Sequence, residues 1–213
     1  MTQNIFQDTQ ESGLANYSYG DITAATGTLT FYGARAGTGP SYILTANLLN
    51  SEPVGESAVI QDIAGPQTIF DIDFDTVINK QLVIRGTTIV NIPIAGSTGG
   101  AGPTYNVIIT AKIRQWDGAT ETDIVSADST TWNINLTTTY RYMAIPLNIP
   151  QTIIKRGNTL RLTVIYTATR AGGAGAGGTG AVAYDPANRT AGWDATGVVP
   201  SQMIAPIPTK IQL

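Results

Sequence analysis

Three aspartates recur at every second position in one short stretch of the sequence. Asp71, Asp73 and Asp75 alternate with large apolar side chains, so on a strand these carboxylates project from one face, roughly 7 Å apart. Such a row could hold a hard cation such as Ca²⁺ if loops add further oxygens. The stretch lacks the glycine and the glutamate of an EF-hand loop, and an ordinary solvated strand face is the favoured interpretation. No metal site is therefore predicted.

Composition removes most other catalytic chemistry. The chain has no histidine and no cysteine, which excludes Ser-His-Asp and Cys-His nucleophile systems, disulfides, and zinc or iron–sulfur sites built on those ligands. A glycosidase needs two carboxyl groups across a cleft, and Glu121 is the glutamate that lies near a predicted strand. Hydrolysis is the least favoured function considered, and neither a catalytic residue nor a cofactor is predicted.

Three tryptophans could serve either as stacking platforms for sugars or as apolar anchors. Trp132 is in phase with the apolar residues that follow it, which predicts a core position. Trp116 lies beside a predicted turn and Trp193 lies in a predicted loop, so both are expected to be exposed enough for an interface. Trp193 is included among the predicted interface residues.

Two glycine-rich stretches, residues 96–103 and 171–180, are predicted to be flexible loops. Gly173, Gly175 and Gly178 match the spacing of a dinucleotide-binding fingerprint. No helix is predicted after them, so nucleotide binding is not expected. In residues 184–189 an aspartate at an N-cap position precedes a proline, which predicts a single helical turn.

The elements that must position all these residues are strands. Apolar and polar residues alternate with a period of two in many segments, whereas no window carries the apolar stripe of a helix. The predicted strands cover residues 28–32, 41–48, 68–75, 82–94 with a break at Gly86, 105–114, 120–125, 132–136, 140–147, 160–167 and 203–211. We therefore predict an all-β fold, an antiparallel β-sandwich of jelly-roll type. Pro146, Pro150, Pro206 and Pro208 are expected on edge strands or at strand ends, because each removes a hydrogen-bond donor.

Residues 1–25 do not fit this alternation. Their apolar side chains are too many for a solvated tail and too irregularly spaced for a sheet face, which predicts an extended N-terminal arm that docks on a neighbouring chain. The predicted interface residues of the arm are Ile5, Phe6, Tyr17 and Tyr19. Residues 26–213 are predicted to form one β-sandwich domain, because all-β sandwiches often reach this length as a single unit.

The charge balance argues against nucleic acid as a partner. The chain has 12 basic and 15 acidic residues and a formal net charge of −3, whereas phosphate binding needs a basic stripe. No apolar run is long enough to span a membrane, and the first residues carry no targeting signal. We expect synthesis in the cytoplasm and no membrane partner.

A resemblance covers residues 140–213. This part contains LNIPQTIIKRGNTLRLTVIYTA, a glycine-rich loop, AYDPANR and a final strand IPTKIQL, and the series resembles the C-terminal half of the β-sandwich decoration (cement) proteins of tailed-bacteriophage capsids. The resemblance implies a non-enzymatic virion protein that stabilises the capsid by binding the outer surface of the major capsid protein shell. It also implies a small homo-oligomer, with a trimer favoured. The alternative is a carbohydrate-binding or adhesion module of a phage fibre or tail protein.

Overall fold

The computed structural model describes residues 15–16, 26–36, 41–48, 55–100, 102–135, 137–189, 193–194 and 198–210. Among these residues there is no helix, and therefore none that could cross a membrane. The described strands are β1 (Ala15–Asn16), β2 (Thr26–Arg35), β3 (Tyr42–Thr45), β4 (Gly55–Ile60), β5 (Pro66–Val77), β6 (Leu82–Thr98), β7 (Thr104–Trp116), β8 (Glu121–Asp128), β9 (Trp132–Asn135), β10 (Thr139–Ile154), β11 (Thr159–Gly172), β12 (Gly178–Ala183) and β13 (Ile204–Lys210). The predicted all-β fold is confirmed.

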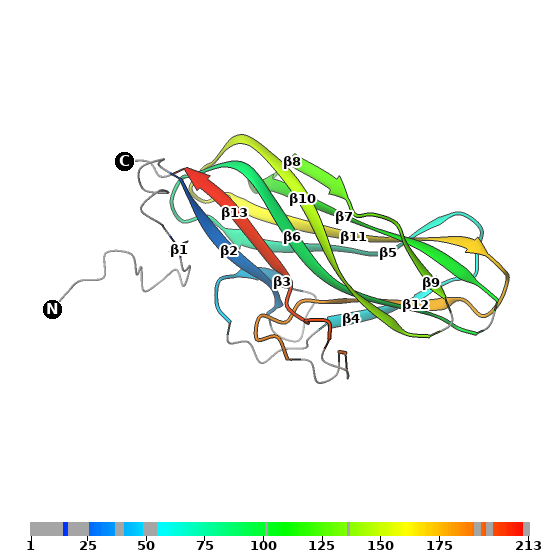
Figure 1. The fold of residues 1–213 in the computed structure, drawn as a ribbon. Coiled ribbons are helices and arrows are strands. Elements are labelled where there is room, and N and C mark those ends of the chain that lie inside the picture. The colour runs from blue at the N-terminus through cyan, green and yellow to red at the C-terminus, as the bar shows by residue number, and fades with distance from the viewer. Residues whose placement is uncertain are drawn as a thin grey trace.

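The strands form two packed layers. One hydrogen-bonded ladder runs in the order β4-β12-β6-β13-β2-β3-β5-β11-β7-β8, while β1, β10 and β9 pair with β2, β6 and β7. The ladder folds back on itself as a β-sandwich, with β10, β6, β13 and β2 in the front layer and β5, β11 and β7 in the rear layer (Figure 1). The linking strand β3 meets β5 in parallel at one residue pair, Ile43 with Asp75. The expected purely antiparallel pairing is wrong there, because no hairpin dictates the direction of this linking strand.

Side-chain alternation builds the core between the layers. The odd-numbered residues of 105–113 on β7 and the even-numbered residues of 160–168 on β11 are all buried, as are the apolar residues of 70–74 on β5. The front layer contributes the opposite face, and the Tyr166 hydroxyl of β11 donates to the Ala95 carbonyl of β6 across the core, at 3.3 Å. Trp132 is 7% exposed within this core, which confirms its predicted position.

The predicted break at Gly86 is a bulge inside a longer strand. β6 continues through Gly86, which has a φ of +130°. The paired strand β10 shifts its register between Ile149 and Thr152, next to the Ile149–Gly86 pair. Glycine tolerates this backbone conformation, and the one extra residue of β10 forms a bulge that does not end the pairing.

The prolines occupy two kinds of position. Pro146 lies in β10, which pairs with β6 alone among the described strands, so its predicted edge position is confirmed. Pro206 and Pro208 lie in β13, between β2 and β6, and for them the edge prediction is wrong. The β13–β2 ladder is continuous whereas the β13–β6 ladder is interrupted between Ile204 and Thr209, so the missing N–H groups face β6. The Thr88 hydroxyl of β6 donates to the Pro206 carbonyl there.

The predicted arm is described at two residues. Ala15 and Asn16 form β1, which pairs with Leu29 and Thr28 of β2. The predicted interface residues Ile5, Phe6, Tyr17 and Tyr19 lie outside the described residues.

Candidate functional site

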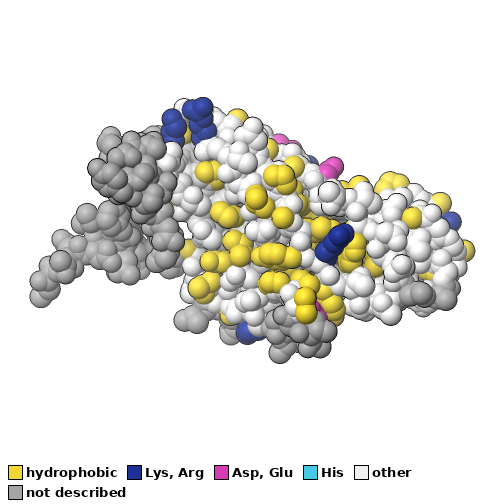
Figure 2. Space-filling model, viewed as in Figure 1, with side chains coloured by type: hydrophobic (Ala, Val, Ile, Leu, Met, Phe, Trp, Pro, Cys, Tyr) yellow, Lys and Arg dark blue, Asp and Glu magenta, His cyan; other side chains and the backbone are white. Residues whose placement is uncertain are grey.

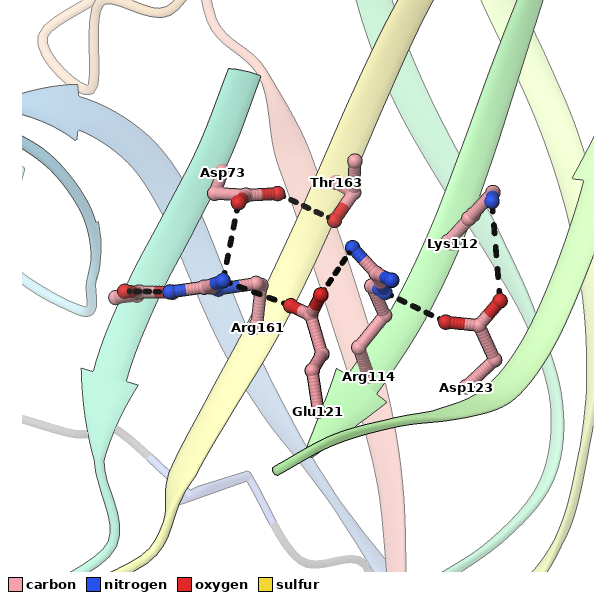
Figure 3. A network of polar contacts seen from close by, with 8 residues as sticks. Asp73, Lys112, Arg114, Glu121, Asp123, Arg161 and Thr163 are labelled. Carbon is pink, nitrogen blue, oxygen red and sulfur yellow. Dashed lines mark hydrogen bonds and ion pairs between the residues drawn. The ribbon is translucent and has the colours of Figure 1, made fainter. Parts of the chain in front are cut away.

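A chain of ion pairs crosses the outer face of the rear layer, from β5 through β11 and β7 to β8 (Figure 3). The strand register places Asp75, Arg161, Arg114 and Asp123 side by side on these four strands. Arg161 donates two hydrogen bonds of 2.7 Å each to the two oxygens of Asp75, and Arg114 Nε donates to Asp123 Oδ1 at 2.6 Å. Because a bidentate arginine–carboxylate pair fixes orientation as well as distance, this row holds the four strands in register.

Glu121 separates the two arginines, which are themselves cross-strand neighbours. Arg161 Nη1 lies 2.7 Å from Glu121 Oε1, and Arg114 Nη1 lies 2.7 Å from Glu121 Oε2. The glutamate considered for hydrolysis therefore has both oxygens in ion pairs. The Arg161 guanidinium also lies 5.8 Å from the centre of the Trp116 ring, a cation–π distance. The hydrogen bonds to Asp75 are the main cause that raises the pKa of Arg161 above its ordinary value.

The aspartate row is the predicted solvated face only in part, because Asp71 is exposed whereas Asp73 and Asp75 are partly exposed and ion-paired. Asp73 accepts a hydrogen bond of 2.6 Å from the Thr163 hydroxyl and pairs with Arg161 Nη1 at 3.0 Å, and Asp75 is the bidentate partner of Arg161. The alternation at 160–163 places Arg161 outward, but only the register shows that it lies beside Asp75. Among the described residues, no group of three or more Asp, Glu, His or Cys side chains is placed to hold a metal ion.

A shallow pocket of about 340 Å³ opens beside these ion pairs. Its lining residues are Ser41, Tyr42, Asp71, Ile72, Asp73, Asp75 and Arg161. The Tyr42 hydroxyl donates to Glu56 Oε1 at 2.5 Å, and burial, followed by this carboxylate, raises the pKa of Tyr42. The pocket therefore presents a neutral phenol, a hydroxyl and carboxylate oxygens, which suit hydrogen bonding to a polar ligand.

The two glycine-rich stretches form a packed end of the molecule. Gly99 N donates to Gly177 O at 2.6 Å, and a Cβ on Gly173 would lie 1.7 Å from Gly102 O. β6 and β11 extend to Thr98 and Gly172 and β12 begins at Gly178, so part of each stretch belongs to strands. The prediction that both stretches are loops throughout is wrong, and the missing side chains let two backbones come into direct contact between the strands.

Asp62 binds the loop that follows β11, at the end of the molecule formed by the glycine-rich stretches. Its carboxylate accepts a hydrogen bond of 2.9 Å from Gly175 N and one of 3.0 Å from Arg170 Nη1. These contacts, the Gly175 bond first, hold the pKa of Asp62 below its ordinary value of 3.8. A carboxyl with a lowered folded-state pKa stabilises the fold above its unfolded pKa, and this contribution is lost as the pH falls through the folded value.

We therefore expect Asp62→Asn to lower stability at neutral pH and to make little difference in strong acid. Urea unfolding midpoints measured from about pH 7 down to about pH 2 test this. Other acidic residues titrate equally in both proteins, so the difference between the two midpoints isolates Asp62. A difference that stayed constant over the whole range would contradict the role given to the ionised carboxylate.

Trp193 does not lie on the surface as the sequence predicted. It is 8% exposed and packs with Ala95 and Ala183, against Tyr140 and Ala181. Its ring centre lies 5.3 Å from that of Tyr140. The small alanine side chains on the outer face of the front layer leave space for the indole, so Trp193 fixes its own segment to the sheet. Its predicted exposure is wrong.

The segment that carries Trp193 begins with a reverse turn rather than the predicted helical turn. Asn188 N donates to Asp185 O at 3.0 Å, and Asn188 has a φ of +53°. The buried Asp185 carboxylate accepts a hydrogen bond of 3.2 Å from Ala187 N and pairs with Arg189 Nη2 at 2.8 Å. Asp185 therefore caps the turn as predicted for an N-cap residue, but the left-handed Asn188 prevents helical continuation.

Trp116 is much more exposed to solvent than the other two tryptophans, and fluorescence quenching can measure this difference. Trp116 is 38% exposed, whereas Trp132 and Trp193 are 7% and 8% exposed. We expect acrylamide to quench the wild-type emission in part and Trp116→Phe to remove most of the quenchable fraction. Equal quenching of wild type and Trp116→Phe would show that one of the other indoles is open to solvent.

The front layer presents a different kind of surface, which we call the uncharged face. Three rows follow the pairs of β10 with β6 and of β13 with β2, and every member is exposed or partly exposed. The rows are Ala144, Asn91, Ile204 and Tyr32; Pro146, Ile89, Pro206 and Thr30; and Asn148, Thr87, Pro208 and Thr28. Figure 2 shows hydrophobic side chains gathered over these strands, with few charged side chains among them.

No protein-family model matches the chain, and no curated protein matches it. Among solved structures, the chain is similar to a CocE/NonD family hydrolase from Staphylococcus aureus, with 13% identity and a TM-score of 0.48 over 91% of this chain and 37% of that one. An aminopeptidase from the marine sediment archaeon Thaumarchaeota archaeon gives 9% identity and a TM-score of 0.48 over 84% of this chain and 36% of that one. Infectious bursal disease virus, Gx strain, gives 14% identity and a TM-score of 0.29 over 94% of this chain and 53% of that one.

The chain thus spans little more than a third of the hydrolase and the aminopeptidase, and about half of the viral protein. At these TM-scores, the likenesses carry no argument about function.

Proposed function

We propose that this chain is a non-enzymatic structural protein of a virion, which decorates a phage capsid by binding the outer surface of the major capsid protein shell. The observation that carries the proposal is the uncharged face, a sheet surface suited to contact between protein subunits, as expected of a protein that works in an assembly. The resemblance of residues 140–213 to capsid decoration proteins supports the same class.

A decoration protein stabilises a capsid because its binding is thermodynamically linked to the assembly of the shell. A protein that binds the assembled shell and not its dissociated subunits stabilises the shell by mass action. The partner is the major capsid protein, and the decorating unit is a homo-oligomer for which the resemblance favours a trimer. The location is the capsid surface, reached after synthesis in the host cytoplasm.

Shell binding can be tested directly. Mass spectrometry of purified virions should find the chain in many copies, and shells stripped of it should rebind the purified protein and melt at a higher temperature. Virions without the chain, or stripped shells that do not bind it, would overturn the proposal.

The carbohydrate-binding alternative rests on the polar pocket beside Tyr42. Carboxylate and hydroxyl oxygens there suit sugar hydroxyl groups, but two of the three tryptophans considered as platforms are buried. The third, Trp116, lies next to the Arg161 guanidinium. Saturable binding on a glycan array that is lost in Asp71→Asn, together with no affinity for shells, would favour this alternative.

A further inference from the structure

The uncharged face is unusual for a surface that meets only water. None of its residues carries a formal charge, and Ile89 at its centre is 50% exposed. Its cross-strand neighbour Pro146 is rigid, as is Pro206 of β13, so little side-chain entropy is lost when they are covered. Exposed apolar surface gathered in this way marks an interaction site.

The opposite side of the sandwich has a different charge. The outer face of the rear layer carries the carboxylates Asp71, Asp73, Asp75, Glu121, Asp123 and Asp128 and the basic groups Lys112, Arg114 and Arg161. It therefore has twice as many acidic as basic groups. Two copies that met through this face would bring excess like charges together, which is unfavourable.

The edge of the front layer is also closed to a further strand. β10 pairs with β6 alone among the described strands, and Pro146 and Pro150 remove N–H donors from it. Prolines on an edge strand prevent another chain from extending the sheet. At the β10 edge, contact between copies is therefore expected to use the face of the sheet.

We propose that the uncharged face packs against the same face of a second copy of this chain. A twofold contact of this kind brings apolar side chains together and opposes no like charges. Four strands about 4.8 Å apart and about 3.3 Å per residue give a footprint of roughly 20 Å by 20 Å. An interface of this size buries less than about 1,200 Å² in total, which is typical of weak, transient complexes. We therefore expect a dissociation constant of about 10–100 μM.

The inference rests on the proposed function in one respect, because it gives the proposed homo-oligomer a surface. It departs from the favoured trimer, since a twofold contact produces dimers or other even-numbered assemblies. The two ideas fail separately. Shell binding by a protein that is monomeric in solution would overturn the inference and keep the proposed function. A protein that dimerises but does not bind shells would overturn the proposed function and keep the inference.

Sedimentation velocity on the purified full chain between about 1 and 200 μM tests the contact. The wild type should change from the 22.4 kDa monomer to a dimer across this range. Ile89→Asp should weaken association at least about tenfold, because two carboxylates would be buried against each other. Val77→Asp is the matched control, since Val77 is 57% exposed and lies on the β5 face that bears the aspartates; it should associate like the wild type.

Monomer at every concentration, a closed trimer, or equal weakening in both variants would overturn the proposal.

Single cysteines supply a second measurement that does not depend on a disruptive charge. The chain has no cysteine, so Ile89→Cys and Val77→Cys each carry one thiol. Ile89→Cys should react with a maleimide several-fold more slowly at high than at low protein concentration, and mild oxidation should join its copies as disulfide-linked dimers. Val77→Cys should show neither effect. Reaction rates for Ile89→Cys that do not depend on concentration would overturn the proposal.

Discussion

Gly173→Ala is expected to lower the free energy of unfolding by about 3 kcal/mol or more. Gly173 has a φ of +66°, and an added Cβ would lie 1.7 Å from Gly102 O. The left-handed conformation alone costs about 1–2 kcal/mol for a residue with a Cβ. The contact adds to this cost because its partner is backbone, which cannot rotate away. In a chain of this size, the melting temperature should fall by about 6 °C or more.

Two matched glycines separate the backbone cost from the clash. Gly65 has a φ of +98° with no atom within 4 Å of the added Cβ, so Gly65→Ala should cost about 1–2 kcal/mol. Gly100 has the same open space without a positive φ, so Gly100→Ala should stay within about 0.5 kcal/mol of the wild type. Denaturant unfolding of the three variants checks the order. Similar losses for Gly173→Ala and Gly65→Ala would show that the two loops do not touch.

Arg161→Ala is expected to lower the free energy of unfolding by about 2–3 kcal/mol. The substitution leaves Asp73, Asp75 and Glu121 without their shared cation and uncovers Trp116. Removing one partner of a fully buried pair costs about 3–5 kcal/mol. The expected loss is smaller because the three carboxylate side chains are 37%, 34% and 25% exposed, which lets water screen them.

Lys112→Ala is the control for Arg161→Ala. Lys112 lies 3.7 Å from Asp123, whose side chain is half exposed, so its loss should cost less than about 0.5 kcal/mol. A double variant, Arg161→Ala with Asp75→Asn, should recover part of the stability, since it removes one unpaired carboxylate. Equal losses for Arg161→Ala and Lys112→Ala would contradict the central role of Arg161.

The strands could be predicted from the sequence because each carries its own alternation. Residues 68–75 and 105–114 place apolar side chains on one face whatever their neighbours are, and both lie inside strands of the structure. Register is a property of two segments together, and no local pattern encodes it. The pairing of Arg161 with Asp75, 86 residues apart, therefore could not be predicted.

Exposure in loops and at glycines depends on partners that are distant in sequence. Trp193 does lie outside the strands, as predicted, but alanines on β6 and β12 leave the space that buries it. The glycine-rich stretches have the composition of flexible linkers. The same lack of side chains allows close backbone packing once another backbone lies alongside, and composition cannot distinguish the two outcomes.

The central place of the C-terminal strand sets the order in which this protein can fold during synthesis. β13 (Ile204–Lys210) lies between β2 and β6, so the front layer has a gap until residue 210 has left the ribosome. Until then β2 and β6 expose hydrogen-bonding edges and the apolar faces they later bury, which are the features that make nascent chains aggregate. Pairings this distant in sequence also form slowly. The front layer is therefore completed only after β13 has been synthesised, and until then the open edges of β2 and β6 are the surfaces that need protection from aggregation.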